Sequence, residues 1–220
     1  MITSDEMIIR IKADSNVTVE EVTGGIKSFK TIAPDSFLEC INKSLLRGGV
    51  ASGLLPRGCL SFNASDNGNR VITMLHESDK ADISYMGTQY KDFPLPRLVF
   101  GFTVSEEGRV SNCKLGVIDN ASMLTPTTPM FIYPFSNVSN NSHLCIGNNP
   151  LPQVKSLHTL GSLPYFLLGA DNNNHSFMPT NNKPCLEMRD LMELLKDKQQ
   201  SYYYEHILLP IGKTLGDFIA

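Results

Sequence analysis

The chain has 220 residues, of which 41% are hydrophobic and 19% charged, and this composition excludes extended disorder. Its 19 Lys and Arg residues are scattered and are outnumbered by 22 Asp and Glu residues. The net charge of -3 argues against nucleic-acid binding, which needs a basic surface. No apolar run approaches the roughly 20 residues of a membrane span. We therefore expect one compact unit that binds neither nucleic acid nor a membrane.

The N-terminal stretch MITSDEMIIRIKADS is acidic where a signal peptide must be basic, and its apolar run is too short. The sequence therefore predicts a cytoplasmic protein. The chain has five cysteines and no C-x-x-C pair, so we expect free thiols in place of disulfides or a structural zinc site. We expect neither a cofactor nor a metal ion.

The first predicted element is a helix over residues 36–47, in the stretch DSFLECINKSLLRGG. Ser36 and Glu39 have the spacing of a capping box, and two glycines after the pattern, Gly48 and Gly49, predict its end. The apolar face of this helix comprises Phe37, Ile41 and Leu45. We place it in an N-terminal extension of residues 1–57, ahead of a main domain of residues 58–220, with both parts in one compact unit.

Short apolar runs separated by turn signals follow, up to about Ile118, and predict an antiparallel β-meander. The clearest hairpin turns at the stretch SEEG, where Gly108 can take a positive φ. After this hairpin, Pro126, Pro129 and Pro134 preclude a helix and favour an extended, irregular path.

Two helices are predicted after residue 150. A short one begins at Pro152, and a longer one begins at Pro184. The longer helix has an apolar stripe that is typical of a face packed on a sheet, formed by Met188, Leu191, Met192 and Leu195. The fold class is therefore α+β: an antiparallel meander with flanking helices and an N-terminal extension.

The stretch PMFIYPFSNVSNNSHLCIG carries the candidate chemistry, because its polar loop ends with Cys145 between Leu144 and Ile146. A thiol on an extended segment, anchored by apolar neighbours, is held exposed for reaction with a bulky partner. A nearby carboxamide can donate a hydrogen bond to the oxyanion that forms when an amine attacks a thioester. Asn137 is the candidate for this donor.

This stretch resembles the active-site segment of the ubiquitin-conjugating enzymes. In that family a YPF strand leads to an asparagine preceded by His-Pro. The catalytic cysteine lies eight positions after this asparagine. Here the YPF of residues 133–135, Asn137 and Cys145 have this spacing, whereas Phe135 and Ser136 replace His-Pro. The chain also has no tryptophan. It is similar to a divergent bacterial branch, prokaryotic family D, which includes protein B of the PRTRC cassette.

The resemblance implies a ubiquitin-conjugating-like fold and a transferase activity. A ThiF-like enzyme would load a small β-grasp, ubiquitin-like protein onto Cys145 as a thioester, and a JAB-type peptidase would process or remove it. The loop GADNNNHSF lies where the family has a loop that prepares the incoming lysine for attack. Asp171 and His175 are the candidate residues for this role. His143, two residues from the thiol, is a further candidate.

Simpler interpretations stand beside each assignment. Cys145 could be a small core residue, Asn137 a turn former and His175 a solvated loop residue. A Cys-His pair of a peptidase is disfavoured, because residues two apart on a strand lie about 7 Å from each other. For the other four cysteines, a core position is the better interpretation: Cys40, Cys59, Cys113 and Cys185.

One alternative belongs to a different class of function. A non-catalytic adaptor of the same fold would bind a ubiquitin-like protein, or assemble a plasmid-borne cassette, without forming a thioester. The missing His-Pro favours this adaptor, and the retained cysteine opposes it.

Overall fold

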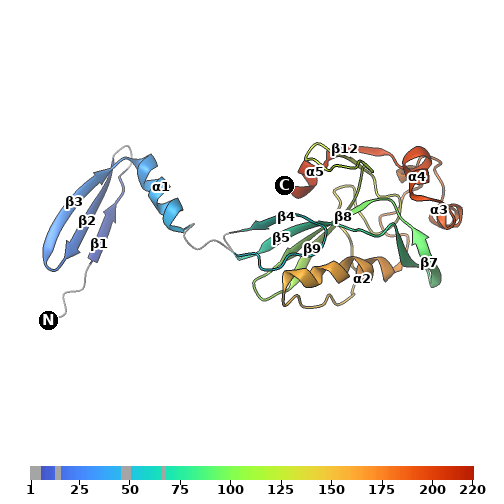
Figure 1. Cartoon of the computed structure of the whole chain (residues 1–220), viewed down its shortest axis with the longest axis horizontal. Coiled ribbons are helices and arrows are strands. Elements are labelled where there is room, and N and C mark those ends of the chain that lie inside the picture. The colour runs from blue at the N-terminus through green and yellow to red at the C-terminus, as the bar shows by residue number, and fades with distance from the viewer. Residues whose placement is uncertain (1–5, 13–15, 46–50, 66–67) are drawn as a thin grey trace. The chain divides into compact units, whose positions relative to one another are not determined.

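A computed structural model describes residues 6–12, 16–45, 51–65 and 68–220 (Figure 1). The chain divides into two compact units, Met1–Ala51 and Ser52–Ala220, in place of the one compact unit that we expected. The physical reason is that the first unit forms a sheet of its own. Among the described residues, no helix is both long and apolar enough to cross a membrane.

The first unit is a three-stranded antiparallel sheet followed by one helix. Its elements are β1 (Glu6–Arg10), β2 (Val17–Thr23), β3 (Ile26–Ile32) and α1 (Pro34–Leu45). This sheet was not predicted from the sequence, although the glycines at positions 24 and 25 supply the positive φ angles of a hairpin turn between β2 and β3.

Helix α1 lies close to the predicted range of 36–47 but begins two residues earlier. Pro34 is the first residue of the helix, so Ser36 lies inside the first turn and the predicted capping box is wrong. Phe37 is buried, whereas Ile41 is 37% exposed, so the predicted apolar face is only partly covered. Residues 46–49 lie outside the described residues.

The second unit is built on a six-stranded sheet in the order β12-β10-β9-β8-β5-β4, with every neighbouring pair antiparallel. These strands are β4 (Cys59–Ala64), β5 (Arg70–Leu75), β8 (Leu98–Val104), β9 (Val110–Ile118), β10 (Pro129–Phe131) and β12 (Pro210–Thr214). The predicted antiparallel arrangement is confirmed, with one difference. Strands β6 (Lys80–Tyr85) and β7 (Thr88–Pro94) are not part of this sheet but form a separate antiparallel hairpin. The short β11 (Asp171–Asn172) pairs with β6 in parallel.

Strand β8 is buried on both faces, and its side chains alternate between two cores. Leu98, Phe100 and Phe102 belong to the larger core, which also holds apolar residues of α2 and α3. Val99 points to the opposite face and joins a smaller core that includes Phe218 from the C-terminal helix. The sheet is therefore covered on both sides.

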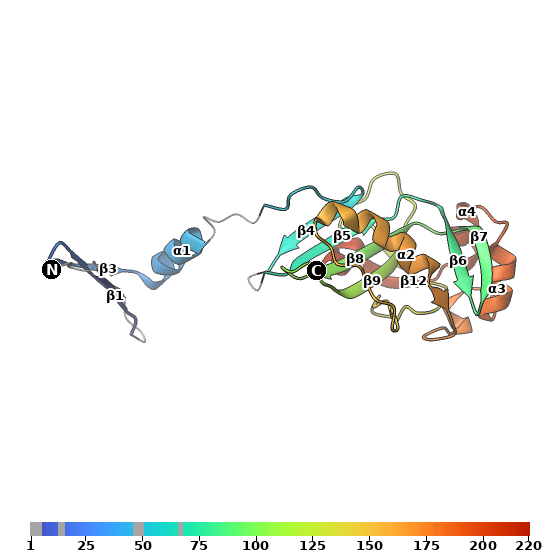
Figure 2. The ribbon, with the colours of Figure 1, turned by 90° about the horizontal axis from the view of Figure 1, so that it is seen from below.

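The helical segments follow the sheet in sequence. They are η1 (Leu157–Ser162), α2 (Leu163–Gly169), η2 (Pro179–Asn181), α3 (Met188–Leu195), α4 (Gln200–Tyr202), η3 (Tyr203–Ile207) and α5 (Leu215–Ile219). Figures 1 and 2 show α2 running along the strands of the large sheet. The four stripe residues predicted for the long helix are all buried in α3 and belong to the larger core, which confirms that this face of the helix is buried.

Both predicted helix starts after residue 150 are too early. Residues 152–156 are not helical, because the amide of Val154 donates to the carbonyl of Gly108 and ties this stretch to the β8–β9 turn. Pro184 does not begin α3, because Cys185 has a left-handed φ of 54° and the side chain of Asn182 binds the amide of Leu186. Each helix begins where these local bonds end.

The turn between β8 and β9 provides a stability test. Gly108 has a φ of 81°, as predicted for the SEEG hairpin, and a Cβ there would clash with the carbonyl oxygen of Val154. We expect Gly108→Ala to lower the free energy of unfolding by about 3 kcal/mol, because it combines this clash with backbone strain. All seven tyrosines lie in the second unit and the chain has no tryptophan, so tyrosine fluorescence during urea unfolding reports on this unit.

Gly87 is the matched control for this substitution. Its φ is 77°, but no atom lies within 4 Å of a Cβ built there. Gly87→Ala should therefore cost only the strain, about 1 kcal/mol. Equal losses in the two variants would show that the contact between the turn and Val154 does not stabilise the unit.

Candidate active site

Residues 137–145 form a narrow antiparallel ribbon that explains the eight-residue spacing. Val138 pairs with Leu144 in a β-bridge, and the amide of Cys145 donates to the carbonyl of Asn137 at 2.8 Å. This register places Asn137 directly opposite Cys145, and residues opposite each other in an antiparallel pair have neighbouring side chains. The asparagine and the cysteine are therefore brought together by local pairing.

The ribbon is anchored to the sheet on the side of Cys145. The amide of Leu144 donates to the carbonyl of Cys113 on β9 at 2.8 Å, and the side chain of Leu144 is buried in the main core. Ile146 packs against the same core, whereas Cys145 itself is only half-buried. The backbone on both sides of the thiol is thus fixed, and the residue that carries it is not fully buried.

A cavity of about 260 Å³ lies over the ribbon and joins it to the loop after α2. Four of the five candidate residues line it: Asn137, Cys145, Asp171 and His175. The other lining residues are Leu144, Ile146, Gly147, Asn149, Leu167, Ala170, Asn172 and Asn173. The structure therefore brings together side chains from two segments that are about thirty residues apart in the sequence.

Asn137 has both the features of a turn residue and those of a site residue. Its φ of 64° is left-handed, a conformation that asparagine tolerates better than most residues. Its amide donates to the carbonyl of His175 at 2.7 Å, and its side-chain Nδ2 donates to Oδ1 of Asn172 at 2.9 Å. The backbone and the carboxamide of Asn137 are thus both tied to the loop across the cavity.

Asp171 is held by the β6–β7 hairpin. Its Oδ1 accepts hydrogen bonds from the hydroxyl of Ser84 at 2.6 Å and from the amide of Gly87 at 3.1 Å. The Ser84 bond first, and then the Gly87 bond, lower the pKa of the Asp171 carboxyl, because both stabilise its charged form. Asp171 therefore carries a negative charge at the edge of the cavity at neutral pH.

Comparison with known protein families finds a match that includes the segments that form this cavity. A family model described as prokaryotic E2 family D matches residues 57–206, which include the ribbon, the cavity loop and most of the second unit. The chain belongs to prokaryotic E2 family D. No curated protein matches it, and no solved structure matches it. Membership of family D implies interaction with ubiquitin-like proteins and activating enzymes in general.

Within this family D chain, His143 stands apart from the other candidates. It is exposed, forms a β-bridge with Lys114 on β9 and lies opposite Ser139 in the ribbon. It does not line the cavity that holds Cys145. His175 does line it, and its own amide donates to Oδ1 of Asn173 at 2.7 Å.

The other cysteines differ from Cys145 in their surroundings. Cys113 is buried, as expected, and burial raises the pKa of its thiol to about 11. Cys59 is half-buried against the core, and burial raises the pKa of its thiol as well. The expected core position is wrong for Cys40 and Cys185, which are both exposed; Cys185 lies in the left-handed turn before α3.

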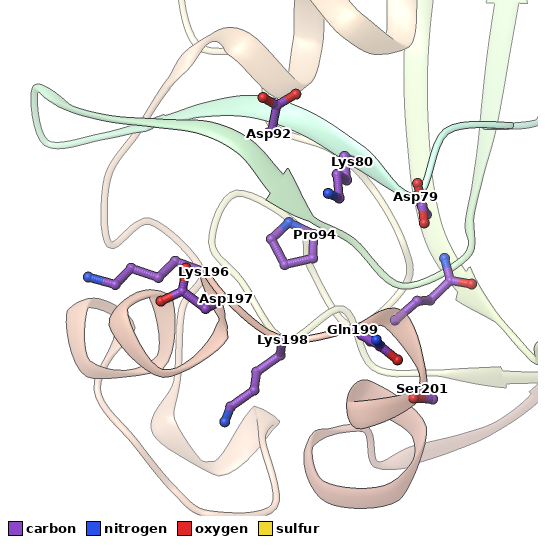
Figure 3. Close-up of a pocket in the computed structure, with 10 residues that line it drawn as sticks. Asp79, Lys80, Asp92, Pro94, Lys196, Asp197, Lys198, Gln199 and Ser201 are labelled. Atoms are coloured by element: carbon purple, nitrogen blue, oxygen red, sulfur yellow. The ribbon is translucent and has the colours of Figure 1, made fainter.

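A larger cavity of about 650 Å³ lies between the β6–β7 hairpin and the segment after α3 (Figure 3). Its charged residues are three acids and three lysines, Asp79, Asp92, Asp197, Lys80, Lys196 and Lys198. These charges balance, and neither cysteine nor histidine lines this cavity. Among the described residues there is also no group of three His, Cys, Asp or Glu side chains placed to hold a metal ion. The smaller cavity, which is lined by Cys145, Asp171 and His175, is the candidate site.

Two residues of this site, Ser84 and Asn172, were not predicted from the sequence. Ser84 lies on a buried strand, and nothing in its neighbourhood along the chain sets it apart. Asn172 is one of three consecutive asparagines, and the pattern alone does not say which of them faces Asn137. The signal that could have raised interest was the position of the run, directly after Asp171.

Proposed function

We propose that this chain is a carrier of a ubiquitin-like protein, held as a thioester on Cys145 and passed on to an amine. The observation that carries the proposal is the register of the ribbon, which sets Asn137 opposite the half-buried Cys145, with both residues lining one cavity. Family D membership supports it, and so does the loop with Asp171 and His175 on the other side of that cavity. Cytoplasmic location and an overall ubiquitin-conjugating-like fold are part of the same proposal.

Loading is a thiol exchange. The Cys145 thiolate attacks the carbonyl carbon of the thioester on a ThiF-like activating enzyme, a new carbon–sulfur bond forms, and the thiol of the enzyme leaves as a thiolate. A cysteine is an intrinsically strong nucleophile, so a small thiolate fraction suffices once the partner is docked. A JAB-type peptidase would act on the carried protein or on its products.

Transfer is an aminolysis. The amine nitrogen attacks the thioester carbon, the bond to Cys145 breaks, and the extra proton on the nitrogen passes to solvent or to a neighbouring base. Asn137 has two side-chain N–H groups, and Asn172 accepts only one bond from them, so the second can donate to the oxyanion. A preorganised donor of this kind stabilises the charge that develops in the transition state.

Asp171 has a different role in this proposal. Its lowered pKa makes it a weak base, since an efficient general base has a pKa near the working pH. A carboxylate that stays charged is suited to hold the incoming amine by hydrogen bonding and charge. His175 or His143 would then supply the basic group, with His175 favoured because it lines the cavity.

The missing His-Pro has a structural replacement in this account. Phe135 and Ser136 are both almost fully buried, and the Phe135 ring packs edge-on against the rings of Phe93, Tyr133 and Tyr203. Such aromatic packing fixes the entry of the ribbon without a histidine.

The charging assay tests the proposal. The purified protein is mixed with a candidate ThiF-like enzyme and a candidate ubiquitin-like protein from the same genome, together with ATP, and separated on a non-reducing gel. We expect an adduct that disappears on treatment with a thiol. If the activating enzyme forms its own thioester but no adduct appears here, the carrier is excluded; co-elution with the ubiquitin-like protein would then identify the adaptor.

A further inference from the structure

We infer that Asn172 is a positioning residue, which sets the orientation of the Asn137 carboxamide and is itself set by backbone carbonyls of β6 and of the loop after α2. This inference rests on the proposed function for its consequence in transfer. Its structural part stands on the hydrogen bonds alone.

The orientation of Asn172 is determined by two acceptors. Its Nδ2 donates to the carbonyl of Ser84 at 3.0 Å and to the carbonyl of Ala170 at 3.1 Å. A side-chain amide has only two N–H groups, so both are used. A flipped amide would place Oδ1 against two carbonyl oxygens and would lose both bonds. The side-chain oxygen of Asn172 must therefore face the other way.

That oxygen faces Asn137 and determines the orientation of its amide in turn. Oδ1 of Asn172 accepts a hydrogen bond from Nδ2 of Asn137 at 2.9 Å. If the Asn137 amide were flipped, two carbonyl oxygens would meet and the bond would be lost. The chain of bonds therefore presents the nitrogen of Asn137, with one N–H engaged and the second one left over. A donor group is what an oxyanion requires at this position.

The support behind Asn172 is part of the fold. Asn172 pairs with Tyr85 in the parallel β11–β6 ladder, and its carbonyl accepts the amide of Met86 at 2.9 Å. Ser84 is buried and binds two consecutive residues of β11. Its hydroxyl donates to Asp171, and its carbonyl accepts a hydrogen bond from the side chain of Asn172. Asn172 is thus fixed from several sides before Asn137 contacts it.

The next asparagines of the run do not share this position. Both are exposed; Oδ1 of Asn173 accepts the amide of His175, and Oδ1 of Asn174 accepts the hydroxyl of Tyr85 at 2.6 Å. Asn174 does not line the cavity, and its side chain makes one bond to the same hairpin. Asn174→Ala is therefore a matched control for Asn172→Ala.

The structural part is tested by NMR of the side-chain amide groups in the full chain labelled with nitrogen-15. In the unmodified protein the two Nδ2 protons of Asn137 should be well separated in chemical shift, because one is bonded to Asn172. In Asn172→Ala this separation should collapse, whereas Asn174→Ala should leave it intact. Asn172→Asp keeps an oxygen beside Asn137 and should lie closer to the unmodified protein than Asn172→Ala does. An unchanged Asn137 signal in Asn172→Ala would overturn the inference.

The consequence for transfer is tested by a double-mutant cycle on the discharge of a preformed Cys145 adduct to free lysine. Asn137→Gly serves as the partner variant, because glycine tolerates the left-handed φ at this position. We expect Asn172→Ala to slow discharge about tenfold, and the double variant to be no slower than Asn137→Gly alone, because both changes remove the same donor. Multiplicative slowing would show that Asn172 acts independently of Asn137 and would overturn the positioning role.

These two experiments separate the inference from the proposed function. If the unmodified protein forms no Cys145 adduct, the proposed function fails, and the NMR experiment still decides whether Asn172 orients Asn137. If the adduct forms and Asn137→Gly slows its discharge while Asn172→Ala discharges at the unmodified rate, the inference alone fails.

Discussion

Cys145→Ser should abolish the thiol-sensitive adduct completely and leave, at most, a slowly formed adduct that resists thiols. A serine hydroxyl at this position can form an oxyester, but it is a far weaker nucleophile than a thiolate at neutral pH. The measurement is the non-reducing gel of the charging assay, run with and without thiol for both proteins. The fold should be unaffected, because Cys145 is only half-buried and the neighbouring Leu144 provides the anchor.

Cys185→Ser is the matched control for this variant. Cys185 is an exposed thiol of the same unit, but it lies in the turn before α3 and does not line the cavity. We expect this variant to charge like the unmodified protein. Loss of the adduct in Cys185→Ser, or its persistence as a thioester in Cys145→Ser, would contradict the assignment of the nucleophile.

Asn137→Gly should slow aminolysis of the Cys145 adduct by about a hundredfold, which corresponds to roughly 3 kcal/mol of transition-state stabilisation. The reason is that the developing oxyanion loses its side-chain donor, while the backbone carbonyl that accepts the amide of Cys145 is retained. Loading should be less affected, because a thiolate is a much stronger nucleophile than an amine. Single-turnover discharge of the isolated adduct to lysine measures the first rate, and the appearance of the adduct measures the second.

Asn137→Ala separates the lost donor from backbone strain. Alanine is strained at the left-handed φ of 64°, whereas glycine is not. Both variants should discharge equally slowly if the carboxamide is the cause. If Asn137→Ala is slow and Asn137→Gly is as fast as the unmodified protein, the asparagine serves only as a turn former.

The part of the site that depends on local pairing could be predicted from the sequence. Cys145 lies eight positions after Asn137, and this spacing is what a tight ribbon needs to set them opposite each other. The apolar neighbours of the thiol also lie as expected, with Leu144 buried and Ile146 packed on the core. The family assignment, made on this one segment, agrees with the match over residues 57–206.

The part of the site that depends on long-range bonds could not be predicted. Ser84 and Asn172 are far apart in the sequence and meet through the parallel β6–β11 ladder, which has only two residue pairs. The helix starts at Pro152 and Pro184 were wrong for a similar reason. In both places tertiary or side-chain bonds to the backbone hold the first residues in other conformations, and proline is compatible with either.

The organisation of the N-terminal part shows a further limit. The stretch after Val17 has a hairpin signal at its two glycines, but its mixed polar and apolar residues gave no strong strand pattern. Many of its apolar side chains are exposed in the structure, for example Ile26 and Phe29 on β3. A regular alternation of apolar and polar residues arises when one face of a strand is buried. A sheet with few buried side chains therefore shows only a weak alternation in its sequence.

Tandem mass spectrometry of the charged protein tests the central claim most directly. The adduct is isolated without reducing agent and digested at mildly acidic pH, which preserves thioesters, and the peptide containing Cys145 is sequenced. We predict that this peptide carries the C-terminal residues of the ubiquitin-like protein on its cysteine sulfur and that thiol treatment removes them. An unmodified Cys145 peptide, with the adduct mapped to another residue or held without a covalent bond, would contradict the account.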